Sequence, residues 1–202
     1  GRDAVIPSLY QDGVSTLRID GTLPTELEIG ATINMDAGGG GLYSNAFVIF
    51  DYQGPTDYKF AGADMRGDTW VIGHRDGEGW HVDAMAGQVL DATTNYNVRV
   101  LIENGAEVSL YAGGNFKLAH QYAGGLNDGQ LGVGMRDSTT HFDNLKVQEF
   151  IPDTFGAQLA SLGPFDKYSG SVQSVRLTFS EPIDPATFTV EDLLELSGPA
   201  GP

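Results

Sequence analysis

The 202-residue sequence has no cysteine, few basic side chains and no long apolar run. It can form neither disulfide bonds nor thiolate zinc sites, although a chain of this length can bury roughly 70% of its unfolded surface without such cross-links. Its 11 Lys and Arg side chains face 27 Asp and Glu, a formal net charge of −16. This charge repels nucleic-acid phosphates, and no apolar run approaches the about 18 residues of a membrane-spanning helix, so we expect neither nucleic-acid binding nor membrane insertion.

Helical periodicity is also scarce, and its best window, residues 190–196, covers only about two turns. Hydrophobic residues make up 41% of the chain, too many for a disordered acidic protein. They alternate with polar residues in short segments, which is the pattern of half-buried β-strands. This pattern predicts eleven strands, over residues 14–19, 26–33, 46–52, 58–65, 69–74, 80–85, 97–102, 107–111, 116–122, 130–135 and 141–150.

Glycine marks the turns between these segments, since 28 glycines are about twice the ordinary usage. The pair Asn104-Gly105 joins two alternating segments and predicts the clearest hairpin, over residues 96–111. Similar pairs suit the left-handed backbone of tight turns at Asp12-Gly13, Asp20-Gly21, Asp76-Gly77 and Asp128-Gly129. The sequence therefore indicates an all-β fold, a two-sheet antiparallel jelly-roll sandwich.

A domain boundary is predicted where proline and glycine interrupt the strand pattern. We expect a first domain over residues 1–150, a linker over 151–156 and the start of a second β domain over 157–202, which is too short to complete a sandwich. Residues 171–179 read as one strand of that second domain. The chain begins without methionine or leader, so we expect a removed signal peptide or a piece of a longer protein, and its end favours the second.

The first domain resembles a known family. Residues 44–62, 72–75 and 78–80 are similar to the laminin-G or concanavalin A-like modules of very large bacterial surface proteins and adhesins. Residues 131–135 and 142–147, with the run Phe142-Asp143-Asn144, resemble the last two strands of such modules. The resemblance implies a concanavalin A-like jelly roll that acts as a binding or adhesive unit.

The tail resembles a second family. Residues 174–188 and 196–199 look like the start of a bacterial Ig-like repeat. Such repeats follow one another as spacers in surface proteins, so the resemblance implies a partial Ig-like domain over 157–202. Together the two resemblances imply a secreted, multidomain protein of the extracellular cell surface.

Sugar binding needs flat aromatic faces beside groups that hydrogen-bond to hydroxyls. Both kinds of side chain gather between residues 51 and 81. For each aromatic ring there, packing in the core is the alternative interpretation. The candidate ligand-binding residues are Tyr52, Asp57, Tyr58, Lys59, Trp70, Arg75, Trp80 and His81.

Calcium is the favoured cofactor, because hard cations take short carboxylates from tight loops. The candidate ligands are Asp20, Asp36 and Asp143, although aspartates also serve turns and solubility. His74 and His81 flank a predicted turn, so we expect them near each other across a hairpin, either as satisfied polar side chains or as metal ligands.

Three functional hypotheses follow. The first is a noncatalytic module that binds a glycan or another cell-surface ligand. The second is a structural module that forms homo-oligomers or an extracellular fibre through strand edges or strand exchange. The third is a jelly-roll glycoside hydrolase, which needs two carboxylates on one strand face. Glu26 and Glu28 alone offer that local spacing, and exposed glutamates on a polar strand face are the simpler interpretation.

Overall fold

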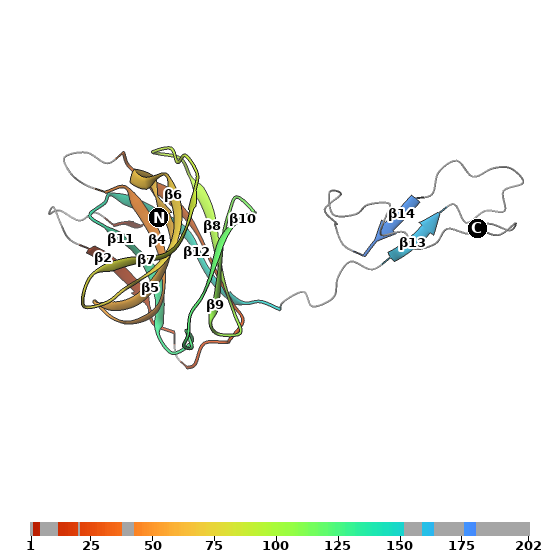
Figure 1. The fold of residues 1–202 in the computed structure, drawn as a ribbon, viewed down its shortest axis with the longest axis horizontal. Helices are drawn as coiled ribbons and strands as arrows, with labels where there is room; N and C mark the ends of the chain where they lie inside the picture. Colours follow the sequence, from red (N-terminus) through yellow and green to blue (C-terminus); the bar gives the residue numbers. More distant parts are fainter. Residues whose placement is uncertain are drawn as a thin grey trace, which may run out of the picture. The chain divides into compact units, whose positions relative to one another are not determined.

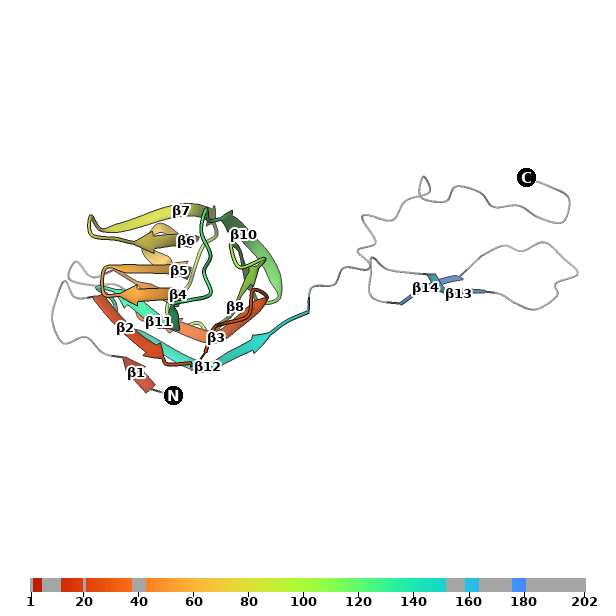
Figure 2. The ribbon, with the colours of Figure 1, turned by 90° about the horizontal axis from the view of Figure 1, so that it is seen from below.

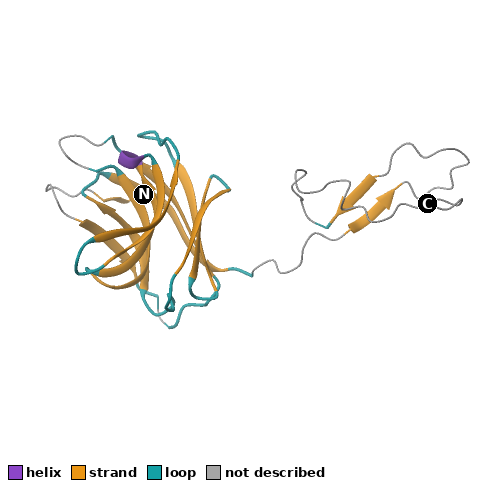
Figure 3. Ribbon diagram, in the orientation of Figure 1, coloured by secondary structure: helices purple, strands orange, loops and turns teal. Residues whose placement is uncertain are grey.

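The computed structural model describes residues 2–4, 12–19, 21–37, 43–151, 159–163 and 176–180. The chain divides into two compact units, Gly1–Ile151 and Pro152–Pro202, each described by itself below (Figure 1). Strands make up nearly all of the regular structure, together with one short 3-10 turn at Met65–Gly67 (Figure 3). None of the helical structure in the described ranges is long and apolar enough to cross a membrane.

The first unit is a sandwich of two six-stranded antiparallel sheets, which curve around a shared core (Figure 2). Sheet A has the order β1 (Arg2–Ala4), β12 (Thr140–Glu149), β3 (Leu27–Met35), β8 (Tyr96–Glu103), β9 (Glu107–Ala112) and β10 (Asn115–Gln121). Sheet B has the order β2 (Asp12–Leu17), β11 (Gln130–Arg136), β4 (Asn45–Gly54), β5 (Asp57–Asp64), β6 (Thr69–Arg75) and β7 (Trp80–Gly87).

The eleven strands expected from the sequence are confirmed, with their ends shifted by at most two residues. The two-sheet antiparallel sandwich is confirmed as well. Strand β1 was not expected. The pair Asp12-Gly13 was expected to form a turn, but it lies inside β2, because Arg136 and Met135 of β11 face it and complete the ladder.

The second unit contains one described pair of antiparallel strands, β13 (Leu159–Gly163) and β14 (Arg176–Phe179). Strand β14 is the described part of the strand expected over residues 171–179. Residues 171–175 and the helical window at 190–196 lie outside the described residues. The Ig-like character of this unit stays a prediction.

The main core lies between the two sheets. Along β3, buried and half-buried residues alternate over all nine positions, so that one face of the strand points into the sandwich. Large buried side chains from both sheets meet there, among them Ile29, Ile33, Phe50, Trp70 and Leu110. This packing explains why the alternating pattern alone was enough to locate the strands.

A second apolar cluster lies on the opposite face of sheet B. Its buried members are Phe47, Ile49, Tyr58, Phe60 and Val71, with Val14, Tyr52 and Trp80 packed against them. Neighbouring residues on these strands, such as Val48 and Ile72, belong to the main core. The central strands of sheet B are therefore buried on both faces, which is why their sequences are nearly continuous hydrophobic runs.

Gly62 is required by the close approach of β5 to the backbone of β4. A Cβ atom at Gly62 would lie 2.1 Å from the carbonyl oxygen of Ala46 and 3.0 Å from the Cα atom of Phe47. Both atoms belong to the backbone of the neighbouring strand, which cannot move aside without breaking the sheet ladder.

We therefore expect Gly62→Ala to lower the free energy of unfolding by about 1–3 kcal/mol, the usual cost of overpacking a core. Gly54→Ala is the matched control, because a Cβ atom there meets nothing within 4 Å. Urea denaturation of both variants measures the difference. An effect of Gly62→Ala no larger than that of Gly54→Ala would contradict this packing.

The hairpin between β8 and β9 forms as the Asn-Gly pair predicts. Asn104 and Gly105 have φ angles of 52° and 66°, the left-handed conformation of a tight hairpin turn. The turn places Glu103 directly opposite Glu107. Burial, together with the charges of Glu107 and Glu26, raises the pKa of Glu103 above its ordinary value of 4.5.

A raised pKa means that folding disfavours the charged form of Glu103, so this group adds stability as the pH falls through its pKa. We expect Glu103→Gln to stabilise the protein near neutral pH by about 0.2–1 kcal/mol, the usual cost of like charges directly opposite each other. The gain should vanish below the ordinary pKa of 4.5, where the wild-type group is protonated in both states. Urea midpoints on either side of that pH test this, and an equal gain at both would contradict it.

Candidate functional site

Two of the aromatic residues predicted to contact a ligand are completely buried. Trp70 packs in the main core, where its Nε1 donates a hydrogen bond of 2.9 Å to Oε1 of Gln88. Tyr58 packs in the second cluster, stacked on Tyr52 with 5.6 Å between ring centroids. Neither Trp70 nor Tyr58 can offer a ring face to a sugar, so their assignment to a ligand site is corrected to core packing.

Trp80 covers the second cluster. Its ring lies 4.7 Å from that of Phe60 and 5.5 Å from that of Phe47, measured between centroids. Its Nε1 donates a hydrogen bond of 2.8 Å to Oδ2 of Asp12, which also lies 3.7 Å from Nε of Arg75. Trp80 and Arg75 therefore face the chain's own residues.

The contact between Trp80 and Asp12 requires a strongly curved sheet. Asp12 lies on β2 and Trp80 on β7, at opposite edges of sheet B with four strands between them. In a flat sheet this separation would be about 24 Å, at about 4.8 Å per strand. The side chains meet because sheet B curls around the second cluster and brings its edges within reach of each other's side chains.

Replacing Trp80 measures how much this closure stabilises the fold. Because the ring is half-buried, we expect Trp80→Ala to lower the free energy of unfolding by about 2–3 kcal/mol, less than a fully buried tryptophan. Trp80→Phe keeps an aromatic ring but loses the bond to Asp12, so it should cost about 1 kcal/mol. Urea denaturation checks both values, and a change below about 0.5 kcal/mol for Trp80→Ala, as for an ordinary surface residue, would refute the closure.

Lys59 also faces partners within the protein. Its Nζ lies 3.2 Å from Oδ2 of Asp51, 4.0 Å from Oδ1 of Asp57 and 5.9 Å from the centre of the Tyr122 ring. Burial raises the pKa of Asp51, although the hydrogen bond from Lys59 opposes this. Asp57, the other predicted ligand residue beside Lys59, has an exposed side chain.

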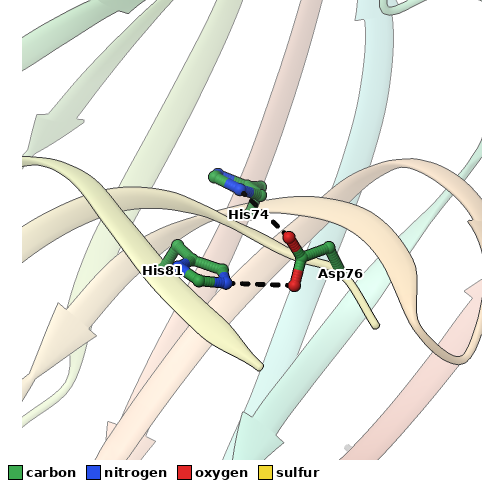
Figure 4. A group of neighbouring side chains, drawn as sticks. All are labelled: His74, Asp76 and His81. Carbon is green, nitrogen blue, oxygen red and sulfur yellow. Dashed lines mark hydrogen bonds and ion pairs between the residues drawn. The ribbon is translucent and has the colours of Figure 1, made fainter. Parts of the chain in front are cut away.

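His74 and His81 meet across the hairpin between β6 and β7, as expected from the sequence, because they are paired directly in the ladder. Their rings are stacked 4.8 Å apart with an interplanar angle of 16°. Asp76 lies beside both, with Oδ1 3.0 Å from Nε2 of His81 and Oδ2 3.9 Å from Nε2 of His74 (Figure 4). The backbone N–H of Glu78 donates to Asp76, which is the main reason that the pKa of Asp76 is lowered.

A concave surface lies elsewhere, on the outer face of sheet A. It is a hollow of about 390 Å³ above Phe142, formed where β3, β12 and the segment before β8 lie side by side. Six of its seven lining residues are polar and offer amide, hydroxyl, imidazole and carboxylate groups. The polar lining residues are Thr32, Asn34, Asn95, His141, Asp143 and Asn144.

Hydrogen bonds hold the lining of the hollow in place. Nδ2 of Asn34 donates to Oδ1 of Asn95 at 2.7 Å, and Nδ2 of Asn144 donates to Oγ1 of Thr32 at 3.2 Å. Strand β12 is irregular after Asp143, and Asn144 has a φ angle of 53°, so this bulge directs the two residues toward the hollow. The polar groups are thus positioned before any ligand arrives.

An aromatic and basic strip continues across the same face of sheet A. Arg99 faces Tyr111 in the ladder and stacks over its ring at 4.8 Å, and Tyr111 contacts Phe116 edge to face. The side chain of Phe116 is 56% exposed. Sequence reasoning missed both this strip and the hollow. The outward polar and aromatic positions of the strands were the available signal, but only the ladder register brings them together.

The calcium prediction is untested. Asp20 lies outside the described residues. Asp143 lines the hollow, and Asp36 lies 3.7 Å from Nε2 of His141, so these two predicted ligands belong to the same region. In the described part of the chain, however, the three side chains close enough to share a metal ion are His74, Asp76 and His81.

The two glutamates with glycosidase-like spacing have other partners. Oε1 of Glu26 accepts the backbone N–H of Asn104 at 3.0 Å and so supports the hairpin turn. Oε2 of Glu28 lies 4.0 Å from Nη1 of Arg99. Neither residue lines the hollow. The spacing therefore serves local structure in this fold.

No family model matches the sequence, and no curated protein matches it either. Solved structures do match. The carbohydrate-binding module CBM66 from Bacillus subtilis has a TM-score of 0.59 and 17% identity, covering 69% of this chain and 84% of its own. The galectin LEC-6 from Caenorhabditis elegans has a TM-score of 0.51 and 12% identity, covering 70% of this chain and 95% of its own.

Sheep galectin-11 is similar too, with a TM-score of 0.50 and 9% identity, covering 71% of this chain and 100% of its own. At such low identities the similarity shows the fold alone. The chain has a jelly-roll β-sandwich fold similar to theirs. The finer resemblances to laminin-G modules and Ig-like repeats stay predictions.

Proposed function

We propose that residues 1–151 form a noncatalytic glycan-binding module whose ligand site is the polar hollow on sheet A. The hollow carries this proposal, because it is an open concave surface lined by preorganised hydrogen-bonding groups. The fold supports it, since the similar structures include a carbohydrate-binding module and galectins. The structural uses found for Glu26 and Glu28 also favour binding over hydrolysis.

The chemistry of the hollow suits a sugar. Amide and hydroxyl groups can donate and accept at once, as a pair of neighbouring sugar hydroxyls requires. Asn34, Asn95 and Thr32 supply such groups from one side, and Asn144 supplies them from the other. The exposed ring of Phe116, further along the same face, offers a flat apolar surface for a second sugar unit.

The wider context belongs to the same proposal. A secreted or cell-surface protein in which this module is followed by an Ig-like spacer would place the hollow near glycans of a neighbouring surface. The net charge of −16 and the low share of basic residues suit a soluble, exposed module. A calcium ion bound at Asp143 would lie beside the ligand, where chelation would weaken glycan binding.

A structural role is the second candidate, and the exposed apolar side chains of strand β7 favour it. Strand β7 ends the strand order of that sheet and exposes Val82 and Met85. An exposed apolar edge strand is a template for pairing with another chain. In that case modules would associate in a concentration-dependent manner without a glycan.

Affinity electrophoresis against a panel of polysaccharides, together with a glycan array, tests the binding function. For a polysaccharide that retards the wild type, Asn34→Ala and Phe116→Ala should each weaken binding about 2- to 10-fold, the value of one hydrogen bond or one ring contact. Both side chains are on the surface of sheet A, so neither change should unfold the protein.

Asp57→Ala is the matched comparison, because Asp57 is exposed on sheet B among the residues first predicted to bind. It should leave binding unchanged. Loss of binding in Asp57→Ala with normal binding in Asn34→Ala would move the site to the hairpin end of sheet B. No retardation by any polysaccharide, alongside concentration-dependent assembly, would replace the binding function with the structural one.

A further inference from the structure

We propose that His74, Asp76 and His81 form a binding site for a divalent transition-metal ion, with Zn²⁺ as the fitting member of the class. Two imidazole nitrogens and one carboxylate oxygen lie within 4.8 Å of one another on a single hairpin. The site is distinct from the calcium site predicted from the sequence and does not depend on glycan binding.

The three donor atoms need only a small movement to surround an ion. At Zn–N and Zn–O distances of about 2.0–2.2 Å, the ligands of a tetrahedral ion lie about 3.3–3.5 Å from one another. Nε2 of His81 and Oδ1 of Asp76 are already 3.0 Å apart, and Nε2 of His74 lies 3.9 Å from Oδ2 of Asp76. A tilt of the His74 ring about its Nδ1 end opens the parallel stack with His81 and brings the third donor into place.

A second carboxylate anchors the Nδ1 end of the His74 ring, as in many zinc sites. Nδ1 of His74 lies 2.8 Å from Oδ2 and 2.9 Å from Oδ1 of Asp83, so it donates its proton to that carboxylate. The hydroxyl of Tyr122 lies 3.0 Å from Oδ2 of Asp83 and holds it from the other side. With Nδ1 protonated, the lone pair of Nε2 is left for a metal ion.

An irregularity in strand β7 explains why Asp83 can accept the hydrogen bond from His74. Gly73 pairs with Val82 and Ile72 pairs with Ala84, so Asp83 is the extra residue of a bulge in β7. Bulges redirect side chains that a regular strand would point elsewhere. Asp83 therefore reaches His74 from the same strand that carries His81.

The turn holds Asp76 ready as a ligand. Its Oδ1 accepts the backbone N–H groups of Glu78 at 2.8 Å and Gly79 at 3.0 Å, which fixes the carboxylate above the hairpin. The side chains of His74, Asp76 and His81 are 32%, 44% and 39% exposed. An ion can therefore enter from solvent, and water can fill its remaining position.

The donor set selects the class of ion. Imidazole nitrogen suits Zn²⁺, Cu²⁺ and Ni²⁺, whereas Ca²⁺ takes oxygen ligands in larger number. A bound ion would join the two strands of the hairpin that carries Trp80, which covers the second apolar cluster. Metal binding should therefore also stabilise the fold.

Calorimetric titration of the metal-stripped protein with ZnCl₂, and separately with CaCl₂, tests the proposal. We expect one Zn²⁺ per chain and no Ca²⁺ effect at this site. His81→Gln and Asp76→Asn should each weaken Zn²⁺ binding at least 10-fold. Both side chains are substantially exposed, and Asn at position 76 keeps an oxygen for the turn, so both variants should melt like the wild type in the presence of chelator.

Two further variants separate a built site from general histidine binding. Asp83→Asn should weaken Zn²⁺ binding about 10- to 100-fold, the usual effect of losing the carboxylate behind a ligating histidine. His141→Gln, which changes a histidine on sheet A, should leave Zn²⁺ binding unchanged.

The absorption spectrum of the Co²⁺-loaded protein should show tetrahedral coordination that His81→Gln removes. Zn²⁺ binding that survives in His81→Gln, or that His141→Gln abolishes, would overturn the proposal, as would no Zn²⁺ binding by the wild type.

Discussion

The burial of large apolar side chains on both faces of sheet B is the constraint on which the rest of the structure depends. The face opposite the main core carries Phe47, Tyr58 and Phe60, which must be covered. The sheet meets this demand by curling until Trp80 packs over these rings and reaches Asp12 on the far edge. The curvature of sheet B therefore buries, within the fold, aromatic rings that would otherwise be exposed to a ligand.

This packing divides the two sheets by role. Sheet B provides stability, and its β6–β7 hairpin, which carries Trp80, gathers His74, Asp76, His81 and Asp83. Sheet A leaves its outer face open, with a polar hollow at one end and the exposed ring of Phe116 further along. The two proposed chemistries, recognition of polar ligands and coordination of an ion, thus fall on different sheets of one small sandwich.

The strands and the β8–β9 hairpin turn could be predicted from the sequence because alternation and the Asn104-Gly105 pair act over a few residues, whereas Asp12-Gly13 became part of β2 through pairing with distant β11. The histidine pair was anticipated for the same reason, since a short turn joins the two positions. The roles of Tyr58 and Trp70 could not be predicted, because consecutive apolar residues on β4 to β6 do not reveal which face is covered. The hollow escaped notice because its residues come from three distant segments that only the ladder register unites.

The central claim is that sheet A meets the ligand while sheet B is filled by its own side chains. The most direct measurement is a ¹H–¹⁵N correlation titration with an oligosaccharide derived from a polysaccharide that the module retains. The account predicts that the amide shifts move around Thr32, Asn34 and Asn144, and that those of β5 and β6 stay still. Shifts centred on β5 to β7, with a silent sheet A, would contradict it.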